Sequence, residues 1–206
     1  GNVLVVGGGK EDGPYSKTVE LYDTTRDVWI ALEPLSVGRA LHTATKLLDG
    51  RVLIVGGRGK KTSSEIYDPR NKKWSSAGDT EYPRAEHSSI RLPDGSVLIT
   101  GGIGQLTQVE LYNPRTNSWS TIGQLSTGRY RHSTSVLSDG TAVVMGGIGE
   151  DGILASTETL NFTGTTIELP DITYKADLYG FNEYEVSESG NDNETINSTD
   201  DSVAAT

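Results

Sequence analysis

Short apolar runs alternate with turn signals along most of this chain. Residues 96–100 (Ser-Val-Leu-Ile-Thr) form an almost continuous apolar run, which is typical of a strand buried on both faces. Residues 108–112 (Gln-Val-Glu-Leu-Tyr) alternate polar and apolar positions, as a half-buried strand does. Asp94-Gly95 supplies the positive φ that a tight hairpin needs. Since no stretch shows helical periodicity, we predict an all-β chain of short strands.

The same pattern returns every 45 residues, and six features stay in phase over three copies. Each copy reads as four short strands and keeps an arginine three residues ahead of a histidine, an Asp-Gly turn, a glycine pair, a Tyr-Asp or Tyr-Asn pair and a tryptophan. The repeated positions are Arg39, Arg84, Arg129, His42, His87, His132, Gly56, Gly57, Gly101, Gly102, Gly146, Gly147, Tyr22, Tyr67, Tyr112, Trp29, Trp74 and Trp119.

A glycine pair that closes an apolar strand, followed by Tyr-Asp or Tyr-Asn and then by Trp, resembles the kelch repeat over roughly residues 1–170. The resemblance implies a kelch-type β-propeller with one four-stranded antiparallel blade per repeat. We expect kelch repeats over 1–172: blade 1 at 1–36 without its first strand, blade 2 at 37–81, blade 3 at 82–126 and a divergent blade 4 at 127–172. In blade 4 we expect Ile167 or a neighbour in place of the tryptophan.

Kelch propellers usually have roughly six or seven blades, so we expect this partial propeller not to close by itself. Blades missing upstream, a second chain, and a four-bladed ring are the three alternatives, and the first is favoured.

We predict that most of the repeated residues are structural. The tyrosines and tryptophans are large enough to wedge neighbouring blades together, and the glycine pairs allow close approach of backbones. The three histidines lie on neighbouring blades about 10 Å apart, too far for one zinc ion. We therefore expect them to form hydrogen bonds with the backbone, and we expect no metal.

Arg39, Arg84 and Arg129 leave two interpretations open. The kelch resemblance implies that the strand after each arginine is the innermost one, and that arginines at this position line the channel rim where kelch adaptors receive an acidic peptide. A guanidinium suits that role because it binds a carboxylate through two parallel hydrogen bonds. The alternative ties each arginine to backbone carbonyls between blades.

The net charge of −10 is uneven. Residues 171–206 hold nine acidic residues and one basic residue, a net charge of −8, so the repeats are almost neutral. We predict that the acidic tail at 173–206 is disordered. One hypothesis is that residues 184–188 (Tyr-Glu-Val-Ser-Glu) fold back onto the arginine rim as a ligand mimic.

Several functions find no support in the sequence. The chain lacks the basic stripe that nucleic-acid binding requires and any apolar run of about 18 residues for membrane insertion. It has no cysteine, which excludes disulfides and the cysteine–tyrosine cofactor of galactose oxidase, a kelch-type propeller. Residues 147–152 spell GxGxxG, but a predicted strand follows instead of a helix, so we expect no dinucleotide site.

We therefore expect a protein–protein interaction scaffold that binds a protein or acidic peptide, has no cofactor and is not an enzyme. Candidate binding loops are 10–17, 58–63, 103–107 and 148–155, whose sequences differ while the strands repeat. The alternative is a fragment of a larger galactose-oxidase-like or carbohydrate-binding extracellular kelch protein whose chemistry lies outside this segment. We lean towards a cytoplasmic location, but sequons at Asn161, Asn193 and Asn197 keep an extracellular one open.

Overall fold

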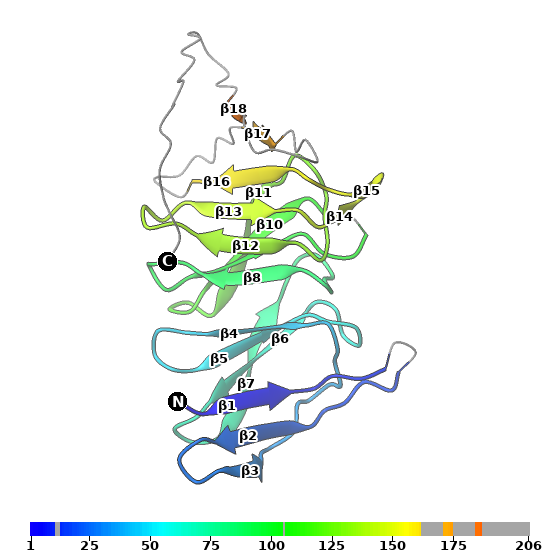
Figure 1. The fold of residues 1–206 in the computed structure, drawn as a ribbon. Helices are drawn as coiled ribbons and strands as arrows, with labels where there is room; N and C mark the ends of the chain where they lie inside the picture. Colours follow the sequence, from blue (N-terminus) through cyan, green and yellow to red (C-terminus); the bar gives the residue numbers. More distant parts are fainter. Residues whose placement is uncertain (11–12, 105, 162–170, 175–183, 187–206) are drawn as a thin grey trace, which may run out of the picture.

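A computed structural model describes residues 1–10, 13–104, 106–161, 171–174 and 184–186 (Figure 1). This part of the chain contains strands and turns and no helix, so the all-β prediction is confirmed. All strand pairs are antiparallel. No helix within the described ranges is long and apolar enough to cross a membrane.

The strands form four main sheets, which follow one another along the chain from blue to yellow in Figure 1. Sheet I contains β1 (Val3–Val6), β2 (Val19–Asp23) and β3 (Val28–Ala31). Sheet II contains β4 (Thr43–Lys46), β5 (Val52–Val55), β6 (Ser63–Asp68) and β7 (Lys73–Asp79). Sheet III contains β8 (Ser88–Arg91), β9 (Val97–Thr100), β10 (Gln108–Asn113) and β11 (Ser118–Gln124). In each of these sheets, strands that are consecutive in the chain are neighbours.

Sheet IV departs from the repeat. It contains β12 (Ser133–Val136), β13 (Ala142–Met145), β16 (Thr157–Leu160), β17 (Asp171–Tyr174) and β18 (Tyr184–Val186) in that spatial order. A small hairpin of β14 (Ile148–Gly149) and β15 (Gly152–Ile153) precedes β16. This hairpin occupies the GxGxxG segment, and β16 follows it as the sequence predicts.

One C-terminal prediction is corrected by the structure. The fourth strand of sheet IV is β17, whereas the prediction for Ile167 lies outside the described residues. β18 lies within the segment predicted to be disordered, and it pairs with β17 at the edge of sheet IV instead of covering the arginines. Both strands are rich in β-branched and aromatic residues, which favour strands despite the acidic surroundings. Residues 187–206 lie outside the described part of the chain.

Two hydrophobic cores lie between consecutive sheets. Val97 and Ile99 of β9 pack towards sheet II, against Leu53 and Val55 of β5, while Leu98 between them packs towards sheet IV. All four residues of β9 are fully buried, which explains why this strand reads as a continuous apolar run. The first strands of sheets II, III and IV also contact one another in order. The sheets therefore stack side by side through repeated contacts. The described sheets do not close into a ring, so the propeller stays a prediction.

Candidate functional site

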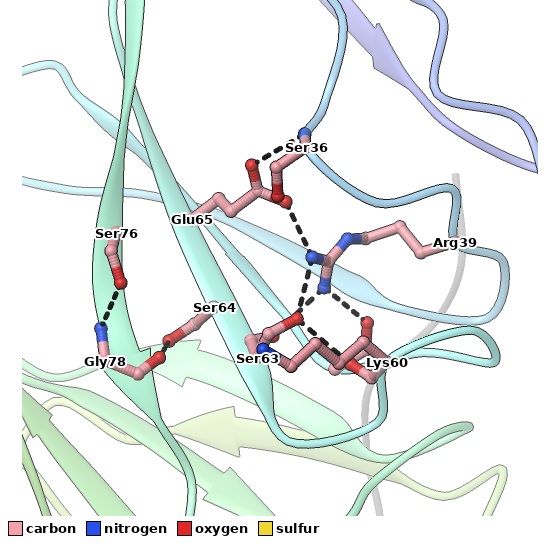
Figure 2. Close-up of polar contacts among 9 residues, drawn as sticks. Ser36, Arg39, Lys60, Ser63, Ser64, Glu65, Ser76 and Gly78 are labelled. Atoms are coloured by element: carbon pink, nitrogen blue, oxygen red, sulfur yellow. Dashed lines mark hydrogen bonds and ion pairs between the residues drawn. The ribbon is translucent and has the colours of Figure 1, made fainter.

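The three repeated arginines lie at the joints between sheets. The Arg39 carbonyl accepts a hydrogen bond from Gly8 N–H of sheet I, and its side chain reaches into sheet II. There Nη1 donates to the carbonyls of Gly56 and Ser63 at 2.7 and 3.0 Å, and Nη2 donates to Glu65 Oε1 at 2.7 Å (Figure 2). We call this arrangement the arginine clasp, since one residue ties two sheets together.

The clasp recurs with the repeat. Arg84 donates to the carbonyls of Gly101 and Gln108 and forms a 2.7 Å ion pair with Glu110. Arg129 in turn donates to the carbonyl of Gly146 and pairs with Glu158. Each of these arginines has 0% of its surface exposed.

The glutamate of each clasp also binds the linker that brings the arginine. Glu65 accepts from Ser36 N–H at 3.0 Å, Glu110 from Glu81 N–H at 2.7 Å and Glu158 from Ser126 N–H at 2.7 Å. In sheets II and III the strand pairing shifts register beside this glutamate, as in a β-bulge. A bulge re-aims side chains, which accounts for a carboxylate directed into the joint.

These contacts decide between the two interpretations of the arginines. Each guanidinium is buried and already donates to carbonyls and to a carboxylate, so its surface is not available to a peptide. The expectation that Arg39, Arg84 and Arg129 line a peptide-binding rim is therefore corrected. The physical reason is that a buried cation requires a buried anion, and the repeat supplies that anion on its own third strand.

The glycine pairs close the same joints. Gly56 and Gly101 have φ of 60°, and a Cβ at these positions would lie 2.5 and 2.2 Å from the carbonyl oxygens of Arg84 and Arg129. The next glycine of each pair donates its N–H to that same carbonyl, at 2.8 Å. Glycine is required here because no side chain fits between the two backbones.

The histidines link each sheet to the preceding one. His87 Nε2 lies 2.8 Å from Thr43 Oγ1, and His132 Nε2 lies 2.8 Å from Thr100 Oγ1, while His42 has a backbone hydrogen bond with Val6. Burial and the nearby arginines lower the pKa of His87 to about 3 and those of His42 and His132 to about 4. The imidazoles are therefore neutral at pH 7. His132 also has a backbone hydrogen bond with Thr100, as expected, whereas the partner of His87 is a threonine hydroxyl instead of the expected backbone group. Among the described residues, no group of three His, Asp or Glu side chains could hold a metal ion.

Trp74 and Trp119 contact the sheet before their own. The indole N–H of Trp74 donates to the Glu33 carbonyl at 2.8 Å, and that of Trp119 donates to the Ala77 carbonyl at 2.9 Å. The tryptophan of each repeat packs against the tyrosine of its own sheet, with ring planes tilted by 36–47° and ring centroids 5.0–5.2 Å apart. Trp29 of sheet I is 57% exposed, because no described sheet precedes it.

The positions that vary between repeats lie two residues after each arginine. Leu41, Glu86 and Arg131 are 45 residues apart, and all three adopt the left-handed backbone conformation, with φ of 55–57°. Their backbones are joined in series: Glu86 N–H donates to the Leu41 carbonyl at 3.0 Å, and Arg131 N–H donates to the Glu86 carbonyl at 2.9 Å. The backbone is thus constant, while the side chain is apolar, acidic or basic.

Non-glycine residues with positive φ cost about 1–3 kcal/mol each and cluster at ligand-binding sites. Three of the six such positions among the described residues lie in the turns before the last strands of sheets I, II and III, and the other three, Leu41, Glu86 and Arg131, line a cleft of about 230 Å³ at the glycine-pair end of the sheets. Its lining residues are Gly9, Lys10, Tyr15, Ala40, Leu41, Arg58, Glu86 and Arg131. Three of them are basic and one is acidic.

Glu86 is the acidic residue that pairs with two basic residues of this cleft. Its side chain is only 4% exposed, and its carboxylate pairs with Arg131 and, at 3.8 Å, with Arg58. Arg131 itself is 60% exposed and lies 5.9 Å from the ring centre of Tyr130. The Ala40 carbonyl accepts from Arg58 N–H at 2.7 Å, which fixes the start of the loop after β5. The cleft therefore holds two guanidinium groups around one buried carboxylate.

A second cleft, of about 280 Å³, lies at the opposite end of the sheets. It is formed by the Asp-Gly turns of sheets III and IV and includes Asp94, Asp139 and Asn161. Asp139 accepts hydrogen bonds from Thr141, which lower its pKa. These carboxylates accept hydrogen bonds within their own turns, so we assign no ligand to them.

The cleft is lined by two of the candidate loops and not by the arginines that the sequence singled out. Loops 10–17 and 58–63 contribute Lys10, Tyr15 and Arg58 to the cleft, whereas the clasp arginines do not. Leu41, Glu86 and Arg131 are not predicted by the repeat pattern, because that pattern consists of positions whose residue type is constant. The sequence signal for these residues is a position that recurs every 45 residues but changes its residue type from one repeat to the next.

No family model matches this chain. The chain is 36% identical over 63 residues to a tRNA wybutosine-synthesizing protein 4 from Candida albicans. The match covers 31% of this chain and 9% of that protein, so the chain spans a small part of its relative's length. The kelch resemblance consequently rests on the repeated residues themselves.

Proposed function

We propose that this chain is part of a kelch-type β-propeller and that it acts as a protein-binding scaffold. The observation that carries the proposal is the set of Leu41, Glu86 and Arg131, three different side chains on one repeated, strained and hydrogen-bonded backbone. On such a surface the side chains differ while the backbone that carries them stays the same, as in binding loops on rigid scaffolds.

The partner of this scaffold is a peptide or protein segment that carries carboxylates. Lys10, Arg58 and Arg131 place three basic side chains in the lining of the cleft, beside the carboxylate of Glu86. Guanidinium groups recognise carboxylates through paired hydrogen bonds. We therefore propose that an acidic peptide binds at the cleft and not at the buried clasp arginines.

Selection of peptides from a random displayed library against the 206-residue chain tests this proposal. The selected peptides should be rich in Asp and Glu, and Arg131→Glu should weaken their binding by about tenfold or more. Arg26→Glu is the matched control, since Arg26 is 75% exposed on the turn at the opposite end of sheet I. Selected peptides without acidic enrichment, or equal losses for both variants, would contradict the proposal.

A second candidate function follows from the relative's name and length. In this proposal the repeats form a non-catalytic part of a longer enzyme or carbohydrate-binding protein. The relative is named for tRNA modification, but the net charge of −10 disfavours tRNA contact by this segment alone. Binding to a glycan array would support the carbohydrate version, and a gel shift with bulk tRNA would support direct RNA contact.

A further inference from the structure

The cleft of the proposed function differs in chemistry from one end to the other. At the end formed by sheets I and II, Leu41 is 45% exposed, and Ala40 and Tyr15 belong to the same lining. At the end formed by sheets III and IV, the side chain of Arg131 is 60% exposed. Glu86, whose side chain is only 4% exposed, stands between them in the order of the repeats. The cleft therefore offers one apolar position and one cationic position.

The apolar position is flanked by described loops of both neighbouring sheets. The loop after β1 contributes Tyr15 and Lys10 from sheet I, and Tyr15 is fixed there by a backbone bridge to Gly9. The loop after β5 contributes Arg58 from sheet II, and its guanidinium lies 3.8 Å from the Glu86 carboxylate. Leu41 is therefore exposed within the cleft, between these two loops.

The cationic position is held in place by its own surroundings. The Nε of Arg131 donates to the Glu86 carboxylate, and its guanidinium lies 5.9 Å from the ring centre of Tyr130. Sheets II and III carry alanine at the repeat position of Tyr130, namely Ala40 and Ala85. The aromatic ring thus occurs in the repeat whose variable position is basic, where it attracts the cation through its π face.

The repeated backbone sets the distance between the two positions. Leu41 is joined to Glu86, and Glu86 to Arg131, by one backbone hydrogen bond each, at 3.0 and 2.9 Å. Backbones paired in this way have Cα atoms about 5 Å apart, so two such steps separate Leu41 from Arg131 by about 10 Å.

One ligand conformation matches this distance. Polyproline II rises about 3.1 Å per residue with about three residues per turn, so side chains three positions apart lie on one side, about 9 Å apart. Side chains on one face of a β-strand are instead about 7 or about 13 Å apart. A helix, about 10 Å across, is too wide for a cleft of about 230 Å³ that extends over this distance.

We propose that the cleft binds a polyproline II segment in which an acidic residue and an apolar residue stand three positions apart. The acidic side chain pairs with Arg131, and the apolar side chain packs on Leu41. A polyproline II segment is already extended before it binds, so little conformational entropy is lost. The inference rests on the proposed function, because it specifies the partner of the same cleft.

Proline peptides of identical composition test the spacing. Each peptide has eight residues, one Glu, one Leu and six Pro, with the Leu two, three or four positions after the Glu, and each is also made with Glu and Leu exchanged. Binding to the 206-residue chain is measured by fluorescence anisotropy. In one of the two orders, we expect the three-position spacing to bind at least about fivefold more tightly than the other two spacings.

Variants of the chain assign the two contacts. Leu41→Ala should weaken the tightest peptide about tenfold and should have no effect on the same peptide with Ala in place of its Leu. Arg131→Gln should likewise weaken only peptides that contain the Glu. Leu48→Ala is the matched control, because Leu48 is another exposed leucine of sheet II, in the turn between β4 and β5 at the opposite end. An unchanged melting temperature verifies that Leu41→Ala keeps the fold.

The outcomes distinguish this inference from the proposed function. If neither the Glu of the peptide nor Arg131 affects binding, both fail. Equal affinity for the three spacings, or no loss with Leu41→Ala, overturns this inference alone. The same holds if none of the proline peptides binds while acidic peptides selected from the library do.

Discussion

The strongest prediction concerns the Arg84–Glu110 pair. Arg84 and Glu110 side chains are both 0% exposed, and their charged atoms lie 2.7 Å apart. Burial lowers the pKa of the Arg84 guanidinium, and the Glu110 charge opposes that shift. Arg84→Met keeps the side-chain stem but leaves Glu110 buried with the Glu81 N–H as its main remaining partner. The carbonyls of Gly101 and Gln108 lose a donor as well.

Removal of one partner from a buried ion pair costs about 3–5 kcal/mol. We expect the free energy of unfolding to fall by that amount in urea titrations followed by tryptophan fluorescence. Since the total stability of a domain is about 5–15 kcal/mol, the single variant is close to the limit of folding. The double variant Arg84→Met/Glu110→Leu removes the orphaned charge, so it should recover at least half of the loss.

Arg70→Met is the matched control. Arg70 also forms a 2.7 Å ion pair, with Asp68, but its side chain is 70% exposed, so solvent screens the interaction. We expect no resolvable change in the urea midpoint for this variant. If the Arg70 and Arg84 variants lost equal stability, or if the double variant were less stable than the single one, burial would not be the source of the effect.

Three further predictions concern the other repeated residues. Gly101→Ala should destabilise more than Gly140→Ala by about 1–3 kcal/mol in the same titration, since both have positive φ but a Cβ at Gly140 meets no atom within 4 Å. The His87 imidazole should stay neutral in NMR titrations down to about pH 4, because its pKa is lowered to about 3, and a midpoint near 6.5 would contradict its burial. The unfolded chain takes up this proton near pH 6.5, so the contribution of His87 to stability is complete above that pH and falls by about 1.4 kcal/mol per pH unit between about pH 6.5 and about pH 3. Trp119→Phe should cost about 1–2 kcal/mol through the lost indole hydrogen bonds, and Trp29→Phe much less, since Trp29 is 57% exposed.

Periodicity alone determined much of the architecture. The 45-residue step, the Asp-Gly turns and the apolar runs predicted all strands of sheets II and III, and they predicted the missing first strand of sheet I. These features succeed because strand pairing within one repeat is local and depends on residues close in sequence. The strands of sheet IV were harder to predict, since β17 and β18 lie beyond the last recognisable copy of the repeat.

The tertiary structure decided what the repeated arginines do. Arg39 and Glu65 are separated in the sequence by two strands and a loop, and the register shift beside Glu65 directs its carboxylate into the joint. Whether a charged side chain faces solvent or a buried partner depends on such long-range contacts, which the residue type does not encode. Repetition in the sequence marked the arginine and the glutamate separately, and only the packing of one sheet on the next showed that they form one unit.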